Sequence, residues 1–561
     1  MTSSLIRGRP RRGTSQIPVR VVLALVGGLV GVAWLVLPGM PISGEGSVTG
    51  GAERPVAGAV AQGEVGETSA ADLVLPLLAV VAVTVVAGYG FFRRRRRARR
   101  RTTPGGAPVQ AAEPAVAELD ERARALLVAA DDSVRVSREE LGFVEERGKA
   151  GGTVVDVEPF AQALRDAEGE LAVAFRMRWQ YEGGVPQEGA ARRHALAGIV
   201  GRCAEAGRLL DAQAAGFDQV RGLEEGLGGG LGHALVVAEA RFRELAGRAG
   251  GAGAALGELG ERYAPSAGAA VAGHAEQAKD RLVFATARLN QARQRADLGD
   301  GERAAGQLRA AEGAVAQAAV FIDGIERLAG ELATAAAMVP AALTGGEAEI
   351  AGARESLKAA EGLLKGAQGL GDAFADVPPG ELRARASHAD LVLAVAREEL
   401  TSRPYDPLDL LRRIVRGVQP VAAGRAGVIA AAALVCARSA VGAADDVVAT
   451  HRAAVGSEAR TRLAEARRLL ARPASAPGAR RPRQDLADLL TADTLAQQAR
   501  ERAEQDIRVY GHPIDGPAAE ASGLTGAVLG GILLAGEPDG GPPASFGGPQ
   551  TRGRRGDTPG A

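Results

Sequence analysis

The sequence predicts an all-α protein that is anchored in a membrane, with long alanine-rich helices arranged in hairpins or a coiled-coil-like bundle and a disordered C-terminal tail. Three observations indicate this class. Leu73–Phe92 is apolar over about 20 residues, the length of a membrane-spanning helix. Aromatic residues make up only 3% of the chain, which favours closely packed small side chains over a thick core. After residue 114, apolar residues recur at three- and four-residue spacing, as in helices that bury one face.

The first 72 residues contain a second candidate membrane segment. Residues 1–20 form a basic N-terminus, expected in the cytoplasm, and Val21–Leu37 is an apolar run that follows it. This run is either a signal peptide or a first membrane helix, because both begin with a basic flank and an apolar stretch. The next residues lack an A-x-A cleavage pattern, which favours a retained helix. Residues 38–72 would then form a short extracytoplasmic loop, too short for an independent domain.

A block of arginines directly follows the membrane helix predicted at residues 73–92. Arginines at one end of such a helix stay on the cytoplasmic side, so nearly everything after residue 101 is expected in the cytoplasm, at the plasma membrane. Residues 93–114 are thus interpreted as a stop-transfer signal and linker; contact of the arginines with anionic lipid headgroups is the alternative. The predicted topology-setting or lipid-facing residues are Arg93, Arg94, Arg95, Arg96, Arg97, Arg99, Arg100 and Arg101.

The charge of the remaining chain bears on its partners. Residues 102–561 carry 53 basic and 62 acidic residues, a net charge of −9. Nucleic acid is therefore not expected as a partner, because phosphate binding needs a basic surface. The expected partners are the lipid bilayer and one or more proteins, or a second copy of the chain bound through helical seams.

Residues 115–511 are predicted to form a cytoplasmic helical region. Apolar stripes run from Phe160 to Phe175 and from Leu196 to Val220, and Cys203 lies within the second stripe, so we expect its side chain to be buried. Proline- and glycine-rich breaks divide the region into roughly eight to ten helices of 20–40 residues. The breaks lie at residues 183–186, 228–230, 265, 297–301, 340, 378–380, 404, 420 and 473–482.

The tail, residues 512–561, is rich in glycine and proline and is predicted to be disordered. It contains one apolar island, Leu524–Ala535, which is too short to span a bilayer. This island could touch a membrane surface or a partner, and an inert tail is the reading that the composition favours.

The sequence offers no constellation of residues typical of catalysis, and no catalytic, cofactor-binding or metal-binding residue is predicted. Cys203 and Cys436 are far apart, and no phosphate-binding glycine loop or nucleophile elbow is present. The acidic pairs Asp131-Asp132 and Asp445-Asp446 are expected on solvated helix faces. The histidines, expected to be solvated or half-buried, are His194, His233, His274, His388, His451 and His512.

Several long segments resemble the cytoplasmic part of TPM domain-containing membrane proteins from high-G+C Gram-positive bacteria. The similar segments, which span most of the chain, are Asp131–Phe143, Phe160–Trp179, Arg403–Leu411, Ala437–Leu470 and Pro543–Gly556.

The resemblance implies a signal peptide, an extracytoplasmic TPM domain, one membrane helix and a long helical region. In other lineages the TPM domain is a small α/β module associated with phosphatase activity and divalent metal binding. This chain departs from that pattern, because residues 38–72 cannot hold such a domain. No TPM catalytic or metal-binding residue can therefore be placed on it.

Together these observations predict a non-enzymatic, membrane-anchored helical scaffold or partner-binding protein. Two alternatives remain. One is an accessory subunit of a membrane or envelope enzyme system, and the other is a degenerate TPM-type phosphatase.

Overall fold

The structure, a computed structural model, describes residues 115–149, 156–223, 230–363, 374, 377–402, 404–471, 482–510, 523–532 and 545–551. Within these ranges every regular element is helical and no strand occurs, which confirms the all-α prediction for this part of the chain. The chain divides into two units, residues 1–109 and 110–561, and all described residues belong to the second. The two predicted membrane segments, the loop between them and the arginine block lie outside the described residues.

The first three described helices pack together as a small bundle. They are α3 (Val116–Lys149), α4 (Glu158–Glu182) and α5 (Gly189–Arg221). The predicted stripes on α4 and α5 are buried in this bundle, and Cys203 is only 2% exposed, as expected. Helix α5 ends at Gly222, which takes a left-handed φ of 61° and donates its N–H to the Asp218 carbonyl at 2.9 Å. A left-handed residue is a common way to end a helix, and glycine adopts it without a steric penalty.

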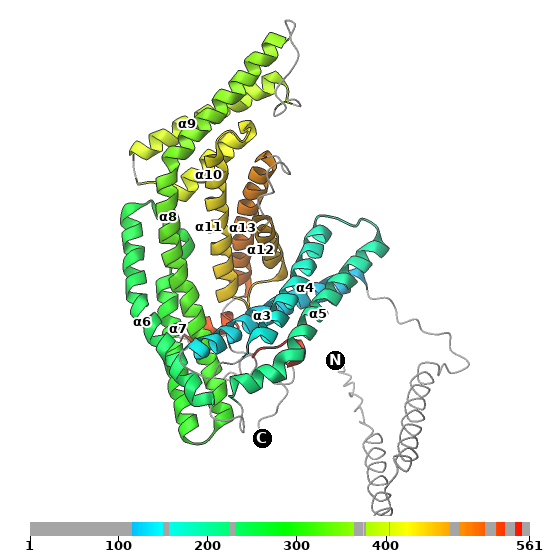
Figure 1. The fold of residues 1–561 in the computed structure, drawn as a ribbon, viewed down its shortest axis with the longest axis vertical. Coiled ribbons are helices and arrows are strands. Elements are labelled where there is room, and N and C mark those ends of the chain that lie inside the picture. The colour runs from blue at the N-terminus through cyan, green and yellow to red at the C-terminus, as the bar shows by residue number, and fades with distance from the viewer. Residues whose placement is uncertain are drawn as a thin grey trace, which may run out of the picture. The chain divides into compact units, whose positions relative to one another are not determined.

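A long central helix organises the rest of the structure. Helix α8 (Gly301–Leu363) packs against α6 (Gly230–Arg262) and α7 (His274–Asp297), and also against α9 (Pro379–Ser402) and α10 (Pro407–Val418). Figure 1 shows α6 and α7 beside one half of α8, and α9 and α10 beside the other. A short 3₁₀ helix, Pro265–Val271, connects α6 to α7. A second one, Gln419–Val421, directly follows α10.

The predicted break at Pro340 is wrong, because α8 continues through this proline. A proline inside a helix removes one hydrogen bond and costs about 3 kcal/mol. Leu332, Ala335, Val339 and Ala342, which flank Pro340 on the buried face, are completely buried in the largest core cluster. Burial of this helix face on both sides of Pro340 offsets the local cost of the proline. The predicted break considered only the position of the proline and not this burial.

Three further helices complete the described body. They are α11 (Gly427–Thr450), α12 (Ser457–Leu470) and α13 (Pro482–Tyr510). Helix α11 packs against α8, α12 and α13, and α12 contacts both α4 and α3. The contact between α12 and α3 joins two parts of the chain that are more than 300 residues apart in sequence.

Two described helices are long and apolar enough to cross a membrane, namely residues 301–359 of α8 and the whole of α11. This is weak support for membrane association. Both helices pack against neighbours within the helical body, and α11 places Asp445 and Asp446 in ion pairs with arginines of α3 and α8. A buried core helix passes the same test of length and composition.

The tail is not disordered in its described parts. Leu524–Leu529 forms the short helix α15, which contacts α7, and Leu529 and Ile532 are buried. Further on, Phe546 is completely buried between Phe160 and Phe217, with ring centroids 6.0 and 4.5 Å away. The glycine-rich composition indicated disorder, but among the described tail residues Leu529, Ile532 and Phe546 are buried against distant helices.

Candidate functional site

Three of the four acids expected on solvated faces, Asp131, Asp132 and Asp445, instead meet in an ionic junction, while Asp446 pairs separately with Arg327 of α8. Asp131 of α3 accepts hydrogen bonds from Arg135 at 3.0 Å and from Arg460 of α12 at 2.6 Å. Arg135 also donates to Asp445 of α11 at 3.0 Å, and Arg467 pairs with the same Asp445. The prediction failed because the three helices come together only in the folded chain, where each carboxylate meets an arginine from another segment.

Arg460 holds the junction together. Its side chain is 1% exposed and donates to Asp131, to Asp132 at 2.7 Å, and to the backbone carbonyls of Arg452 and Val455 at 2.6 and 3.1 Å. Burial alone would raise the pKa of Asp131, but the neighbouring guanidinium groups of Arg135 and Arg460 hold that pKa well below its usual value. Asp131 is therefore ionised at neutral pH.

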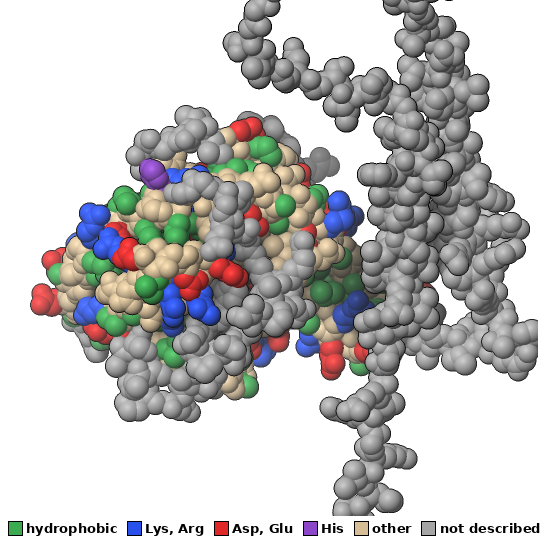
Figure 2. All heavy atoms as spheres, turned by 90° about the horizontal axis from the view of Figure 1, so that it is seen from below, with side chains coloured by type: hydrophobic (Ala, Val, Ile, Leu, Met, Phe, Trp, Pro, Cys, Tyr) green, Lys and Arg blue, Asp and Glu red, His purple; other side chains and the backbone are tan. Residues whose placement is uncertain are grey.

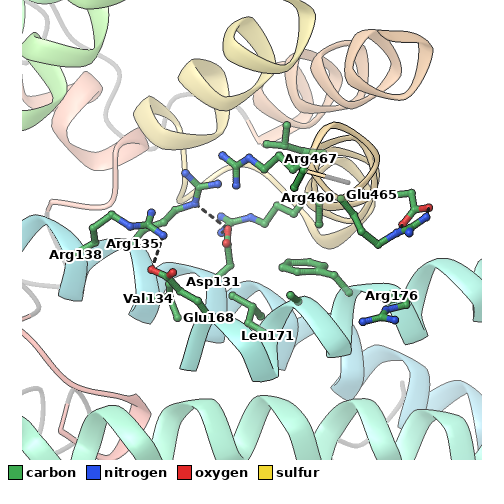
Figure 3. Close-up of a pocket in the computed structure, with 16 residues that line it drawn as sticks. Asp131, Val134, Arg135, Arg138, Glu168, Leu171, Arg176, Arg460, Glu465 and Arg467 are labelled. Carbon is green, nitrogen blue, oxygen red and sulfur yellow. Dashed lines mark hydrogen bonds and ion pairs between the residues drawn. The ribbon is translucent and has the colours of Figure 1, made fainter. Parts of the chain in front are cut away.

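A pocket of about 550 Å³ opens beside this junction, between α3, α4 and α12. Figure 3 shows Asp131, Arg135 and Arg138 reaching it from α3, Glu168, Leu171 and Arg176 from α4, and Arg460, Glu465 and Arg467 from α12. Its volume lies within the range of pockets that bind small molecules.

The lining of the pocket has an apolar part and a strongly cationic part. The apolar residues are Val134, Leu171, Ala172, Phe175, Leu463, Ala464 and Ala471. The charged residues are the six arginines Arg135, Arg138, Arg176, Arg460, Arg467 and Arg468 and the three acids Asp131, Glu168 and Glu465. Arginine binds carboxylate and phosphate groups through a planar fork of donors, so this arrangement fits an anionic ligand with an apolar portion.

A second buried polar group lies around Phe321. The rings of His274 and His451 approach the Phe321 ring, with centroids 5.1 and 6.4 Å away. His274 is 7% exposed, so the expectation of a solvated or half-buried ring is wrong for this residue. Burial, together with the charges of nearby arginines, lowers the pKa of both histidines to about 4. Both rings are therefore neutral at physiological pH. Among the described residues, no group of three or more His, Cys, Asp or Glu side chains comes together as a metal site.

The cysteines are separate buried thiols. Cys203 lies in the core of α3, α4 and α5, and Cys436 lies on α11 within the largest core cluster. Burial raises the pKa of the Cys203 thiol to about 12, so it stays protonated and is a poor nucleophile.

The arginines predicted from the sequence as lipid-facing, residues 93–101, lie outside the described residues. Sequence reasoning missed the pocket arginines, because each appeared as one more charge on a helix surface. One signal was available: all lining residues except Ala471 lie in the segments 131–143, 160–179 and 437–470, which carry the family resemblance.

Comparison with known proteins gives one group of relatives. UPF0603 proteins from two strains of Mycobacterium tuberculosis are each 30% identical to this chain over 460 residues, which cover 79% of this chain and 66% of the relative. The chain thus spans just under two thirds of the length of these relatives.

Two other comparisons give no match. No family model and no solved structure matches the chain, and membership of the TPM domain-containing proteins is not confirmed. The chain is therefore a distant homologue of the UPF0603 protein of Mycobacterium tuberculosis.

Proposed function

We propose that this protein is a membrane-anchored helical scaffold that binds partner proteins on the cytoplasmic side of the plasma membrane and carries out no chemistry of its own. The anchor is the apolar segment Leu73–Phe92 with the arginine block that follows it.

The observation that carries the proposal is the long-range ionic connection within the helical body. Arg460 and Arg452, on either side of the α12 N-terminus, pair with Asp131 and Glu139 of α3, which lie more than 300 residues away in the sequence. Such pairing favours one helical body over a string of separate hairpins. A body of fixed shape beneath the membrane is what a scaffold needs to hold a partner.

The surface supports protein binding better than nucleic-acid binding. On the face shown in Figure 2, arginine, lysine and acidic side chains are interspersed among apolar ones. Many of the exposed charges pair locally, as Arg208 does with Glu205 and Lys279 with Glu276. Nucleic-acid binding would need a continuous basic stripe.

The alternative of an accessory subunit differs from the scaffold only in the partner, which would be an enzyme. A degenerate phosphatase would need a nucleophile or a metal site. Its test is turnover of a generic phosphate ester by the full chain with added Ca²⁺ or Mg²⁺, and we expect none.

The proposal is tested by purifying the tagged full chain from its own membranes in mild detergent after chemical crosslinking in the cell. We expect a stable complex of the chain with at least one other protein or with further copies of itself. A chain recovered only as a monomer, under conditions that preserve known complexes in the same membranes, would contradict the proposal.

A further inference from the structure

The pocket between α3, α4 and α12 has an uneven charge that its internal ion pairs do not balance. Arg138 pairs with Glu168 at 2.7 Å, and Arg468 pairs with Glu465 through two hydrogen bonds of 2.6 and 2.7 Å. Arg135, Arg460 and Arg467 share the three carboxylates of the ionic junction, Asp131, Asp132 and Asp445.

One cation is left over. Arg176 is exposed to the pocket and has no hydrogen-bond or ion-pair partner among the described residues. It comes from α4, one residue after the buried Phe175 of the pocket floor. Figure 3 shows Arg176 toward the same end of the pocket as Glu465, so the Glu465–Arg468 pair of α12 and Arg176 mark one end of the cavity.

This cationic end adjoins an apolar floor. Leu171 and Phe175 come from α4 and Leu463 from α12, and all three line the pocket. Inorganic phosphate alone would use the arginines and leave this floor in contact with water. A ligand that also covers the floor binds more tightly, because it removes apolar surface from water.

We propose that this pocket binds an aliphatic chain with a phosphate head, the phosphate held by Arg176 and Arg468 and the chain lying over Leu171, Phe175 and Leu463. Arg468 can share its donors between Glu465 and a phosphate oxygen, and Arg176 has all its donors free among the described residues. Binding involves no covalent step. This inference goes beyond the proposed scaffold role and does not depend on it, because it concerns a ligand inside the body and not a partner on its surface.

The test uses the full chain in nanodiscs of phosphatidylcholine, with decyl phosphate that carries a diazirine at the far end of its chain. After photolysis, peptide mass spectrometry locates the adducts. We expect them on residues 171–175 of α4 and 463–464 of α12, and empty nanodiscs provide the background. Excess unlabelled decyl phosphate should abolish these adducts, while the same concentration of inorganic phosphate or of decanol should leave most of them.

Two variants examine the two parts of the pocket. Arg176→Gln should raise the concentration of unlabelled decyl phosphate that halves the labelling at least about tenfold, because one charge-assisted hydrogen bond to the phosphate is lost. Arg176→Lys keeps the positive charge and should bring this concentration part of the way back to the wild-type value. Ala172→Phe fills the pocket from an exposed helix position and should abolish the adducts. The matched controls are Arg208→Gln, on the surface of α5, and Ala240→Phe, on the exposed face of α6, and both should behave as the wild type.

Several results would overturn the inference. Equal competition by decanol would show that the phosphate head plays no part, and equal competition by inorganic phosphate would show that the chain plays none. Adducts that are absent, or that persist unchanged in Ala172→Phe while its circular dichroism matches the wild type, would exclude the pocket as the binding site.

Discussion

Replacing Arg460 with glutamine is expected to destabilise the helical body by about 3 kcal/mol, near the lower end of the 3–5 kcal/mol range for breaking a buried ion pair. The Arg460 side chain is 1% exposed and that of Asp131 is 9% exposed, so solvent screens this pair little. Arg460→Gln removes the donors to Asp131, Asp132 and the carbonyls of Arg452 and Val455. We expect a loss near the low end of the range because Asp131 keeps its hydrogen bond from Arg135.

The assay is urea unfolding of the full chain in nanodiscs, followed by the helical circular dichroism signal. Arg208→Gln is the matched control, because Arg208 pairs with Glu205 on the exposed surface of α5, where such a pair contributes at most about 1 kcal/mol. The combined variant Asp131→Leu and Arg460→Met should recover part of the loss, since it leaves fewer unpaired charges. If Arg460→Gln costs no more than Arg208→Gln, the junction does not hold α3 to α12 and the reasoning is refuted.

Three further predictions concern other buried groups. Phe546→Ala should destabilise the fold by about 3–5 kcal/mol, because its ring is completely buried against Phe160 and Phe217, and limited proteolysis should then cut the tail faster; an unchanged cleavage rate would count against its docking. The folded pKa of His274 is about 4 against 6.5 unfolded, so its contribution to stability is present above pH 6.5 and is lost as the pH falls toward 4. The stability difference between wild type and His274→Gln should therefore shrink by about 2 kcal/mol from pH 7 to pH 5 in urea titrations, and a constant difference would disprove the burial effect. Cys203 should resist iodoacetamide at pH 8 in the folded chain and react at once in urea, as read by mass spectrometry; rapid labelling without urea would contradict its burial.

Much of the local structure could be predicted because helix formation and one-sided burial are periodic in the sequence. The stripe from Phe160 to Phe175 and the seam through Cys203 are buried as expected. Most of the predicted breaks fall at or between helix ends, as at residues 183–186 between α4 and α5 and at residue 404 between α9 and α10. Proline, glycine and polar caps act within a few residues of themselves, so their effect can be read locally.

The site could not be predicted in the same way, because its residues converge from distant segments. Asp131 and Arg460 are separated by 329 positions, and nothing in either helix alone indicates the other. The acidic pairs have the composition of a solvated face, and only the folded chain brings Arg460 of α12 to Asp131 and Asp132 and Arg135 of α3 to Asp445. Pro340 and Phe546 illustrate the same limit, since long-range packing overrides a local preference in both places.

Hydrogen exchange of the full chain, compared between its own membranes and purified nanodiscs, tests the central claim of a partner-binding helical body most directly. If the protein is a scaffold, a contiguous stretch of helix surface in residues 115–510 should exchange more slowly in the native membrane, where the partner is present. Identical exchange in both settings, at every peptide of this region, would contradict the account.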